Sequence, residues 1–251
     1  MYANIQLDRS DGIATLTLNR PEKLNAYTQE MGEEITHAFR ALRDDADVRV
    51  VILTGAGRGF CAGVDLDHLK AHQAAGGEAK GPKLGEEDFI RELPLELMAY
   101  PKPVIAAING AAIGVGITMA LPCDIRIAAA GVKLGFTFAA LGILPGLGST
   151  HLLPHLVGPA AAKELVLSAR VFLAEEAAAI GLVNKVVPGD ALMNEARAMA
   201  SAMAAHDPAV LAAAKQALDF GAAHDMSEAM RNEQEQSAAL RDLRIKKQDS
   251  R

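Results

Sequence analysis

The chain has 251 residues, 50% of them hydrophobic and 22% charged, with a formal net charge of −6. This composition supports a sizeable hydrophobic core and argues against global disorder. The acidic balance and the small number of aromatic residues, 7 Phe, 3 Tyr and no Trp, argue against nucleic acid as a partner. Basic side chains gather in the tail at 241–251, where a solvent-exposed helix end is the simpler interpretation.

The first elements of the chain predict a strand, a helix and a strand in a crossover unit. Residues 13–18, IATLTL, alternate polar and apolar side chains as a half-buried strand does. Residues 28–43 place apolar side chains on one stripe of a helix, and residues 48–54 are apolar enough for a buried strand. This order is typical of a parallel sheet with crossover helices.

The middle of the chain continues the alternation. Residues 70–90 are rich in Gly, Ala and charge without a clear period, which favours a loop, and a short amphipathic helix is expected directly after it. Strands are expected at 104–108 and 124–129, with a Gly-rich turn and a short helix between them. Residues 145–157 predict a helix that bends at Pro154.

The last part of the chain is mostly helical in pattern. A strand-like VNKVV interrupts it at 183–187, two Ala-rich helices flank Asp207-Pro208, and a final helix is expected from about 226 to 247. This shift in pattern predicts an α/β fold with two parts, a core over 1–190 and a C-terminal helical subdomain over 191–251.

The spacing of the cysteines and the longest uncharged stretch indicate in which cellular compartment the protein is expected. Cys61 and Cys123 lack the spacing of a disulfide framework or a metal site, so we expect a reducing compartment, the cytoplasm, and no metal. The first residues lack the apolar core of a signal peptide. Residues 104–123 carry no charge over a membrane-spanning length, but Asn109, three glycines and Pro122 favour strand, turn and helix in a soluble core.

The stretch GAGRGFCAGVDLDHL, residues 55–69, follows a predicted buried strand and is rich in glycine. A dinucleotide site requires GxGxxG opening a helix, and a P-loop requires GxxxxGK[ST]; neither pattern is present. Bare backbone also lets N–H groups point at a ligand oxygen, as in an oxyanion hole, and residues 110–116 at a predicted helix start offer a second such place. From the residues alone, glycines that only allow tight turns between packed strands explain the pattern slightly better.

Several segments together resemble the crotonase superfamily, the enoyl-CoA hydratase/isomerase family. They come in the family's order and spacing over about residues 5–190. These segments are LNRPEKLNAYT (18–28), ILTGAGRGFCAGVDL (52–66), PKPVIAAINGAAIGVGI (101–117), CDIRIAA (123–129) and LGILPGLGST (141–150).

The resemblance implies a fold, a substrate class and an assembly. The fold is a crotonase-like spiral of repeated strand-strand-helix units with a C-terminal helical trimerisation region. The substrate is an acyl-CoA thioester, with no cofactor besides the CoA that it carries. The expected assembly is a homotrimer or homohexamer, with no nucleic acid and no membrane as partner.

The resemblance also implies which residues form the site. The thioester oxygen would lie between the main-chain N–H groups of Val64 and Val115. Asp65 is more simply a helix cap than a base, and Cys61 a buried residue rather than a nucleophile. The remaining substrate-binding positions are Lys23, Leu24, Ala26, Ala62, Asp65 and Leu66 for CoA, Phe138 as the lining of the acyl pocket, and Ile113, Gly114 and Pro145.

The chain departs from the family at its acid/base positions. Where hydratases of the family have two glutamates, this chain has Thr118 and Phe138, and where another subset has an aspartate after the proline it has Gly146. A carboxylate acid/base typically contributes ~10²–10⁴-fold, so these replacements argue against ordinary enoyl-CoA hydration, and Phe138 argues against the common double-bond isomerases of the family as well. Thr118 stays a candidate catalytic residue, through a hydrogen bond to water or to the acyl group.

Two classes of function therefore stay open. The first is an acyl-CoA lyase, isomerase or hydrolase that stabilises a thioester enolate, for which decarboxylation of a malonyl-type ester would need little base. The second is a non-catalytic acyl-CoA-binding protein. Each candidate for a base elsewhere is more simply a solvated residue; these candidates are His68, His72, Glu86, Glu87, Asp88, Glu92 and His151.

Overall fold

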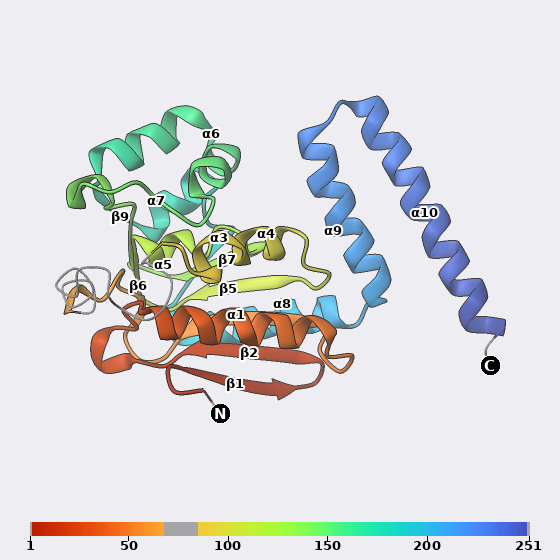
Figure 1. Cartoon of the computed structure of the whole chain (residues 1–251), viewed down its shortest axis with the longest axis horizontal. Helices are drawn as coiled ribbons and strands as arrows, with labels where there is room; N and C mark the ends of the chain where they lie inside the picture. Colours follow the sequence, from red (N-terminus) through yellow and green to blue (C-terminus); the bar gives the residue numbers. More distant parts are fainter. Residues whose placement is uncertain (1, 68–84, 250–251) are drawn as a thin grey trace.

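The computed structural model describes residues 2–67 and 85–249, which form two β-sheets covered by helices (Figure 1). The strands are β1 (Ile5–Ser10), β2 (Ile13–Leu18), β3 (Val50–Gly55), β4 (Gly59–Cys61), β5 (Val104–Ile108), β6 (Ala111–Ile113), β7 (Ile125–Ala129), β8 (Lys133–Gly135), β9 (Val171–Leu173) and β10 (Lys185–Val187). The helices are α1 (Gln29–Asp44), α3 (Asp88–Arg91), α4 (Leu93–Met98), α5 (Val115–Thr118), α6 (Ser149–Ser168), α7 (Ala174–Ala179), α8 (Leu192–Ala204), α9 (Pro208–Ala223) and α10 (Met226–Asp249).

The strands alternate between the two sheets along the chain. The larger sheet has the order β1-β2-β3-β5-β7-β10 and the smaller one β4-β6-β8-β9. Each of the successive pairs β3–β4, β5–β6 and β7–β8 thus gives one strand to each sheet, and helices follow each pair. The predicted α/β spiral of strand-strand-helix units with C-terminal helices is confirmed.

The larger sheet is covered on both faces, which explains the nearly continuous apolar runs of its inner strands. In β3, Val51 and Leu53 pack in the cluster that includes α1, whereas Val50 and Ile52 pack in the cluster that includes α8. The α1 stripe expected from the sequence is buried, and Thr28 caps that helix by accepting a hydrogen bond from the N–H of Met31 at 3.3 Å. Figure 1 shows α1 and α8 on opposite sides of β2 and β5.

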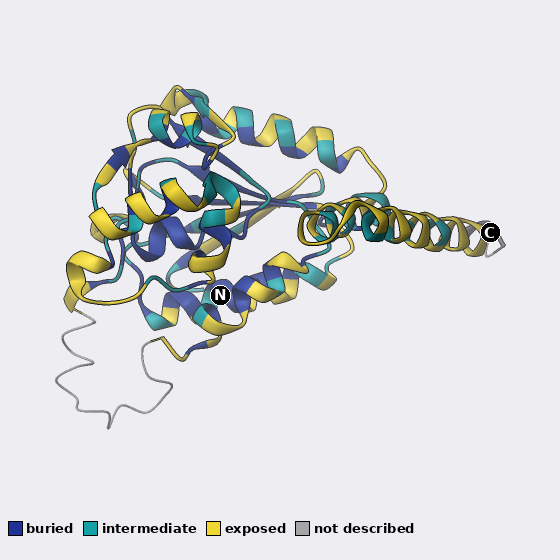
Figure 2. Ribbon diagram, turned by 90° about the horizontal axis from the view of Figure 1, so that it is seen from above, coloured by how far each residue is buried: buried dark blue, intermediate teal, exposed yellow. Residues whose placement is uncertain are grey.

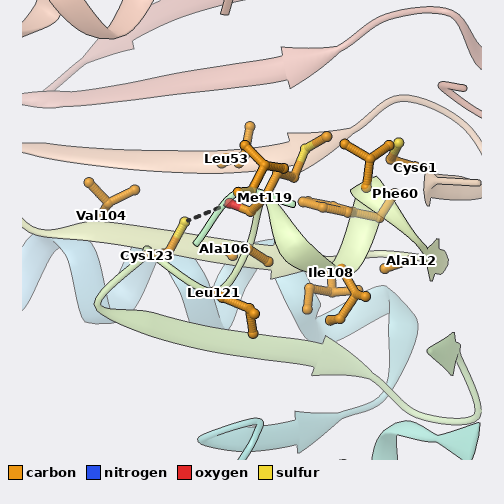
Figure 3. Packing of buried hydrophobic residues seen from close by; sticks show 14 of the residues in the cluster. Leu53, Phe60, Cys61, Val104, Ala106, Ile108, Ala112, Met119, Leu121 and Cys123 are labelled. Carbon is orange, nitrogen blue, oxygen red and sulfur yellow. Dashed lines mark hydrogen bonds between the residues drawn. The ribbon is translucent and has the colours of Figure 1, made fainter. Parts of the chain in front are cut away.

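A dense apolar cluster lies where the two sheets meet. Figure 3 shows Leu53 and Ile108 of the larger sheet close to Phe60 and Cys61 of β4 and to Met119, directly after α5. Residues from both sheets are fully buried in this cluster, so the glycine-rich segments that follow β4 and β6 start from a rigid base.

The helices α9 and α10 form a hairpin that extends away from the two sheets, and Figure 2 shows mostly exposed residues along it. Lys215 of α9 ties the hairpin to the core, because its Nζ lies 2.9 Å from a carboxylate oxygen of Asp124. Large apolar side chains stay exposed on the hairpin, among them Leu218 at 76% and Met226 at 80%. The division of the chain at residue 190 stays a prediction; α8, which follows it, packs on the larger sheet.

The expected strands and helices agree well with the structure, and one expectation is wrong. The bend in α6 lies at Gly158, which has φ 79°, and not at Pro154. A glycine adopts this positive φ without strain, and Pro159 then starts the second helical segment, whereas Pro154 is accommodated inside the first. In the part of the chain that the structure describes, no helix is both long enough and apolar enough to cross a membrane.

Candidate active site

The glycine-rich segments after β4 and β6 run side by side. The strands β4 and β6 pair in parallel, with Gly59 opposite Ala111 and Cys61 opposite Ala112. Beyond this pairing the backbones approach closely: a β-carbon added to Gly116 would lie 2.1 Å from the carbonyl oxygen of Cys61. Glycine at position 116 is therefore required by space rather than by turn conformation.

The N–H group of Val64 is available for a ligand. On either side of it, the N–H of Tyr27 donates to the Gly63 oxygen at 2.8 Å and the N–H of Asp65 donates to the Tyr27 oxygen at 2.9 Å. Successive N–H groups of an extended chain point in opposite directions, so the Val64 N–H points away from Tyr27. Among the residues that the structure describes, it donates to no acceptor.

The N–H group of Val115 is a second available donor. Val115 is the first residue of α5, so its N–H has no partner within the helix. The preceding Gly114 has φ 54° and anchors the turn by donating its N–H to the Gly135 oxygen at 2.8 Å. Gly63 approaches this turn, because a β-carbon there would lie 3.3 Å from the Ile113 oxygen. The two donors thus lie on adjoining segments.

The residues predicted to hold CoA come together from two segments. The Ala62 N–H donates to the Leu24 oxygen at 3.1 Å, and the Lys23 Nζ lies 3.1 Å from an Asp67 oxygen. Leu24 has φ 50°, Ala26 is half-buried beside it, and Leu66 is 55% exposed. The geometry is compatible with a CoA site along these segments, and the individual roles stay predictions.

Asp65 has structural partners. Its carboxylate accepts a hydrogen bond from the Asp67 N–H at 3.1 Å, the contact of a helix cap, and from the Arg20 Nη2 at 2.9 Å. The Asp65 side chain is 8% exposed, so the Arg20 guanidinium compensates a largely buried charge. This arrangement is consistent with the cap that the sequence suggested. Arg20 was not predicted for this role, because it lies 45 residues away and carries no local signal.

Asn25 is a second residue that the sequence analysis did not single out. It is fully buried with φ 55°, and its side-chain amide donates to the oxygens of Ala56 and Gly59 at 2.9 and 2.8 Å. Its Oδ1 accepts from the Arg20 N–H at 2.8 Å. Asn25 therefore holds the loop before α1 against the glycine-rich stretch, and asparagine tolerates this left-handed conformation better than most residues.

The residues predicted to surround the acyl group are apolar. Phe138 is 7% exposed, and its Cζ lies 4.0 Å from the place of a β-carbon on Gly114. Ile113 and Pro145 are half-buried. The segment after Phe138 exposes large apolar side chains, which are Leu141 (56%), Ile143 (49%) and Leu144 (88%).

Thr118 and Gly146 are two of the residues found where the sequence resemblance led us to expect an acid. Thr118 is fully buried, and its Oγ1 lies 3.3 Å from the Val115 oxygen, within its own helix turn. Gly146 is half-buried and lies against Ile90, whose Cγ2 is 3.7 Å from the place of a β-carbon. A direct role of Thr118 in catalysis stays a prediction.

The other candidate bases have surface or structural partners where they are described. Asp88 pairs with Arg40 at 2.9 Å, and Glu86 lies 3.8 Å from Arg91. Glu87 is buried and accepts a hydrogen bond from Tyr27, whereas Glu92 is exposed. His151 is exposed on α6, with its ring 4.1 Å from that of His155. His68 and His72 lie outside the described residues.

Cys61 is unsuited to nucleophilic chemistry. Its side chain is fully buried, and burial raises the pKa of its thiol to about 12. A thiol with this pKa stays protonated near neutrality and is a weak nucleophile. Within residues 2–67 and 85–249, no cluster of three or more acidic, histidine or cysteine side chains is arranged to hold a metal.

A surface hollow of about 520 Å³ lies away from these segments. It is lined by Tyr2 and by side chains of α1, which are Glu30, Glu33, Glu34 and His37. None of the predicted site residues lines it, and Tyr2 and His37 already share a hydrogen bond of 2.8 Å across it. The chemistry-bearing segments therefore remain those around Val64 and Val115.

Comparison with protein families gives a match over nearly the whole chain, because residues 8–248 match the family described as enoyl-CoA hydratase/isomerase. The chain is 40% identical over 233 residues to a short-chain-enoyl-CoA hydratase of Clostridium acetobutylicum, covering 92% of this chain and 87% of that protein. It is also 39% identical over 208 residues to a 1,2-epoxyphenylacetyl-CoA isomerase of Escherichia coli, covering 83% and 79%.

Solved structures show the same fold. A crystal structure of an enoyl-CoA hydratase from Bacillus anthracis superimposes with a TM-score of 0.86 at 34% identity, covering 98% of this chain and 97% of that one. An enoyl-CoA hydratase subunit structure from Geobacillus kaustophilus gives a TM-score of 0.85 at 31% identity, with 95% and 90% covered.

Proposed function

Because the chain belongs to the enoyl-CoA hydratase/isomerase family, we propose that it stabilises the enolate of an acyl-CoA thioester between the N–H groups of Val64 and Val115. One observation carries the proposal: these two N–H groups lack acceptors in the described part of the chain and lie on adjoining segments, where Gly63 approaches Ile113 and Gly116 approaches Cys61. Two convergent N–H donors stabilise the negative charge that develops on a carbonyl oxygen.

The surroundings of the two donors suit this role. Segment 59–64 is fixed by the buried Asn25 side chain and by the Tyr27 main chain, and Val115 is fixed by the turn at Gly114. Donors that are held in place before the reaction contribute more than mobile ones, because they need no reorganisation when charge develops. The CoA moiety would extend over Lys23, Leu24 and Ala26, and the acyl group toward Phe138 and the segment that follows it.

The acid/base positions argue against ordinary hydration and, through Phe138, against the common double-bond isomerases of the family, which leaves lyase chemistry or an isomerisation that uses another base. Thr118 and Phe138 carry no carboxylate to orient and activate a water, so fast addition of water to a double bond lacks its usual catalysts. Decarboxylation of a malonyl-type ester is a second candidate within this class, because loss of CO₂ generates the enolate without a base. The apolar Phe138 beside Gly114 favours an apolar acyl group.

The assembly and compartment follow as further proposals. We expect a homotrimer or homohexamer in which the helices from α9 onward pack against other copies, because this hairpin exposes Leu218, Met226 and Met230. Both cysteines are free and buried, in keeping with a cytoplasmic protein. Light scattering coupled to size-exclusion chromatography measures the mass of the assembly, and a monomer at micromolar concentration would contradict the proposed oligomer.

The central test is a substrate panel. Purified protein is mixed with crotonyl-CoA and with malonyl-, aryl- and dienoyl-CoA esters, and the products are followed by mass spectrometry. Turnover of any of these esters, by a reaction other than the hydration of crotonyl-CoA, supports the proposal. Fast hydration of crotonyl-CoA would contradict the interpretation of Thr118 and Phe138. Binding of the esters without any product would favour the alternative, a non-catalytic acyl-CoA-binding protein.

A further inference from the structure

The main chain of Tyr27 holds the segment that presents the Val64 amide. Its N–H donates to the Gly63 oxygen at 2.8 Å, and its oxygen accepts from the Asp65 N–H at 2.9 Å. These two hydrogen bonds flank Val64 on both sides. The direction of the Val64 N–H is therefore set by where the backbone of Tyr27 lies.

The side chain of Tyr27 reaches across to the segment before α3. It is 1% exposed, and its hydroxyl donates to the Oε1 of Glu87 at 2.7 Å. Its ring stacks on that of Phe89 with centroids 4.8 Å apart. Gly32 of α1 makes room for the hydroxyl, because a β-carbon there would lie 2.6 Å from the hydroxyl oxygen.

Glu87 connects this contact to the other side of the proposed acyl site. It is 2% exposed, its Oε2 accepts from the Gly85 N–H at 2.6 Å, and its main-chain oxygen accepts from the Ile90 N–H at 2.9 Å. Ile90 in turn lies against Gly146, next to the predicted substrate-binding residue Pro145. A continuous series of contacts thus runs from Val64 through Tyr27 and Glu87 to this segment.

We propose that Tyr27 and Glu87 are positioning residues for the acyl-CoA reaction, because their buried hydroxyl–carboxylate contact sets the orientation of the Val64 N–H. This inference rests on the proposed function. A buried carboxylate must keep its hydrogen-bond donors, and Tyr27 supplies one of them. Without that hydroxyl, Glu87 keeps only the Gly85 N–H as a donor to its carboxylate in the described part of the chain, and the ring at residue 27 is held to this segment by the stack on Phe89 alone. Hydrogen bonds weaken steeply as the donor angle departs from linearity. A small rotation of the Val64 amide therefore weakens the hydrogen bond from its N–H to the thioester oxygen.

The test uses Tyr27→Phe in the full chain and reads the thioester directly. Butanoyl-CoA labelled with ¹³C at the carbonyl is bound to each protein, and the C=O stretching band is measured by isotope-edited infrared spectroscopy. Donation of hydrogen bonds to the carbonyl lowers this frequency. We expect Tyr27→Phe to lose at least half of the wild-type shift and about tenfold in kcat on the best ester of the panel. The Kd for butanoyl-CoA is expected to change less than threefold, because CoA contacts stay intact.

Tyr100→Phe is the matched control. Tyr100 is also buried, at 2% exposed, packs edge-to-face on Phe39 and donates its hydroxyl to the Phe39 oxygen at 2.7 Å. Neither of these two contacts of Tyr100 reaches the glycine-rich segments. We expect this variant to lower the melting temperature while it leaves the carbonyl band and kcat unchanged. A purely structural role of Tyr27 would give the same result as Tyr100→Phe.

Glu87→Ala is the second variant, and it is compared with the wild-type protein if Tyr27→Phe does not fold. It removes the acceptor of the Tyr27 hydroxyl, so we expect it to lose at least half of the wild-type band shift. Glu87→Gln keeps one side-chain oxygen for that hydroxyl and should retain more of the band shift than Glu87→Ala. An unchanged band and kcat in Tyr27→Phe, or equal losses in Tyr27→Phe and Tyr100→Phe, would overturn the positioning role. Neither result would contradict the proposed oxyanion hole. A wild-type protein that binds butanoyl-CoA without any shift of the band would overturn the oxyanion hole itself, and the positioning role with it.

Discussion

The backbone of Gly116 lies against the carbonyl oxygen of Cys61 so closely that a β-carbon at residue 116 would stand 2.1 Å from that oxygen. This contact joins the two segments that carry the Val64 and Val115 amides. No side chain larger than a hydrogen fits there unless the segments separate.

Gly116→Ala is therefore expected to lower both stability and activity. Overpacking against backbone costs about 3 kcal/mol, and separation of the segments moves the amides apart. Urea unfolding and ester turnover measure the two effects. Gly221→Ala on α9 is the control, because its β-carbon would meet only Ala229, at an ordinary 3.6 Å. Equal behaviour of the two variants would contradict the close approach.

Restoring a carboxylate at the second acid/base position should restore hydration. We expect Phe138→Glu to raise the rate of crotonyl-CoA hydration at least tenfold, because a positioned carboxylate can activate water beside the thioester. Ultraviolet absorbance of the enoyl thioester follows the reaction. Phe138→Gln makes a similar cavity and polarity without a base, so an equal gain in that variant would refute acid/base catalysis as the cause.

The ion pair of Arg20 and Asp65 is expected to matter more for stability than that of Lys23 and Asp67. The Asp65 side chain is 8% exposed, so Arg20→Ala leaves a buried carboxylate without its cation and costs about 2 kcal/mol. The Lys23–Asp67 pair is exposed, and Lys23→Ala should leave the free energy of unfolding nearly unchanged. Lys23→Ala should instead raise the Kd for CoA esters. Chemical denaturation and isothermal calorimetry separate the two results.

The two buried thiols predict a loss of stability in alkaline solution. Burial raises the pKa of both Cys61 and Cys123 to about 12, from an ordinary value of 9.0. The folded protein therefore holds these protons more tightly than the unfolded chain. The contribution of these two protonated thiols to the free energy of unfolding is fully present below pH 9. It is lost as the pH rises from 9 toward 12.

Cys123→Ala isolates this effect. Between pH 8 and pH 10, the wild-type protein should lose about 1 kcal/mol more of its free energy of unfolding than the variant does. Denaturant unfolding at the two pH values gives the difference.

The same burial should keep both thiols unreactive toward iodoacetamide in the folded protein at pH 8. Rapid labelling would contradict their burial.

The fold was largely predictable from the sequence because its signals are local. The apolar runs at 50–54 and 104–108 and the helical stripe of α1 are each set by neighbouring residues, and the structure has these elements where they were expected. The bend of α6 was misplaced because a proline is visible in the sequence, whereas the positive φ of Gly158 is not. The short strands β4, β6, β8 and β9 were not predicted, because three residues carry too little periodicity, and the longer β1 was not predicted either.

The sequence by itself determined the family, the order of the elements and the segments in which the two amides lie, since all of these are encoded in short contiguous motifs. Only the tertiary structure decided which side chains hold those segments together. Asn25 reaches Gly59 across 34 residues, and Tyr27 reaches Glu87 across 60. Such pairs leave no periodic trace in the chain, because a hydrogen bond between distant residues depends on where the folded backbone brings them.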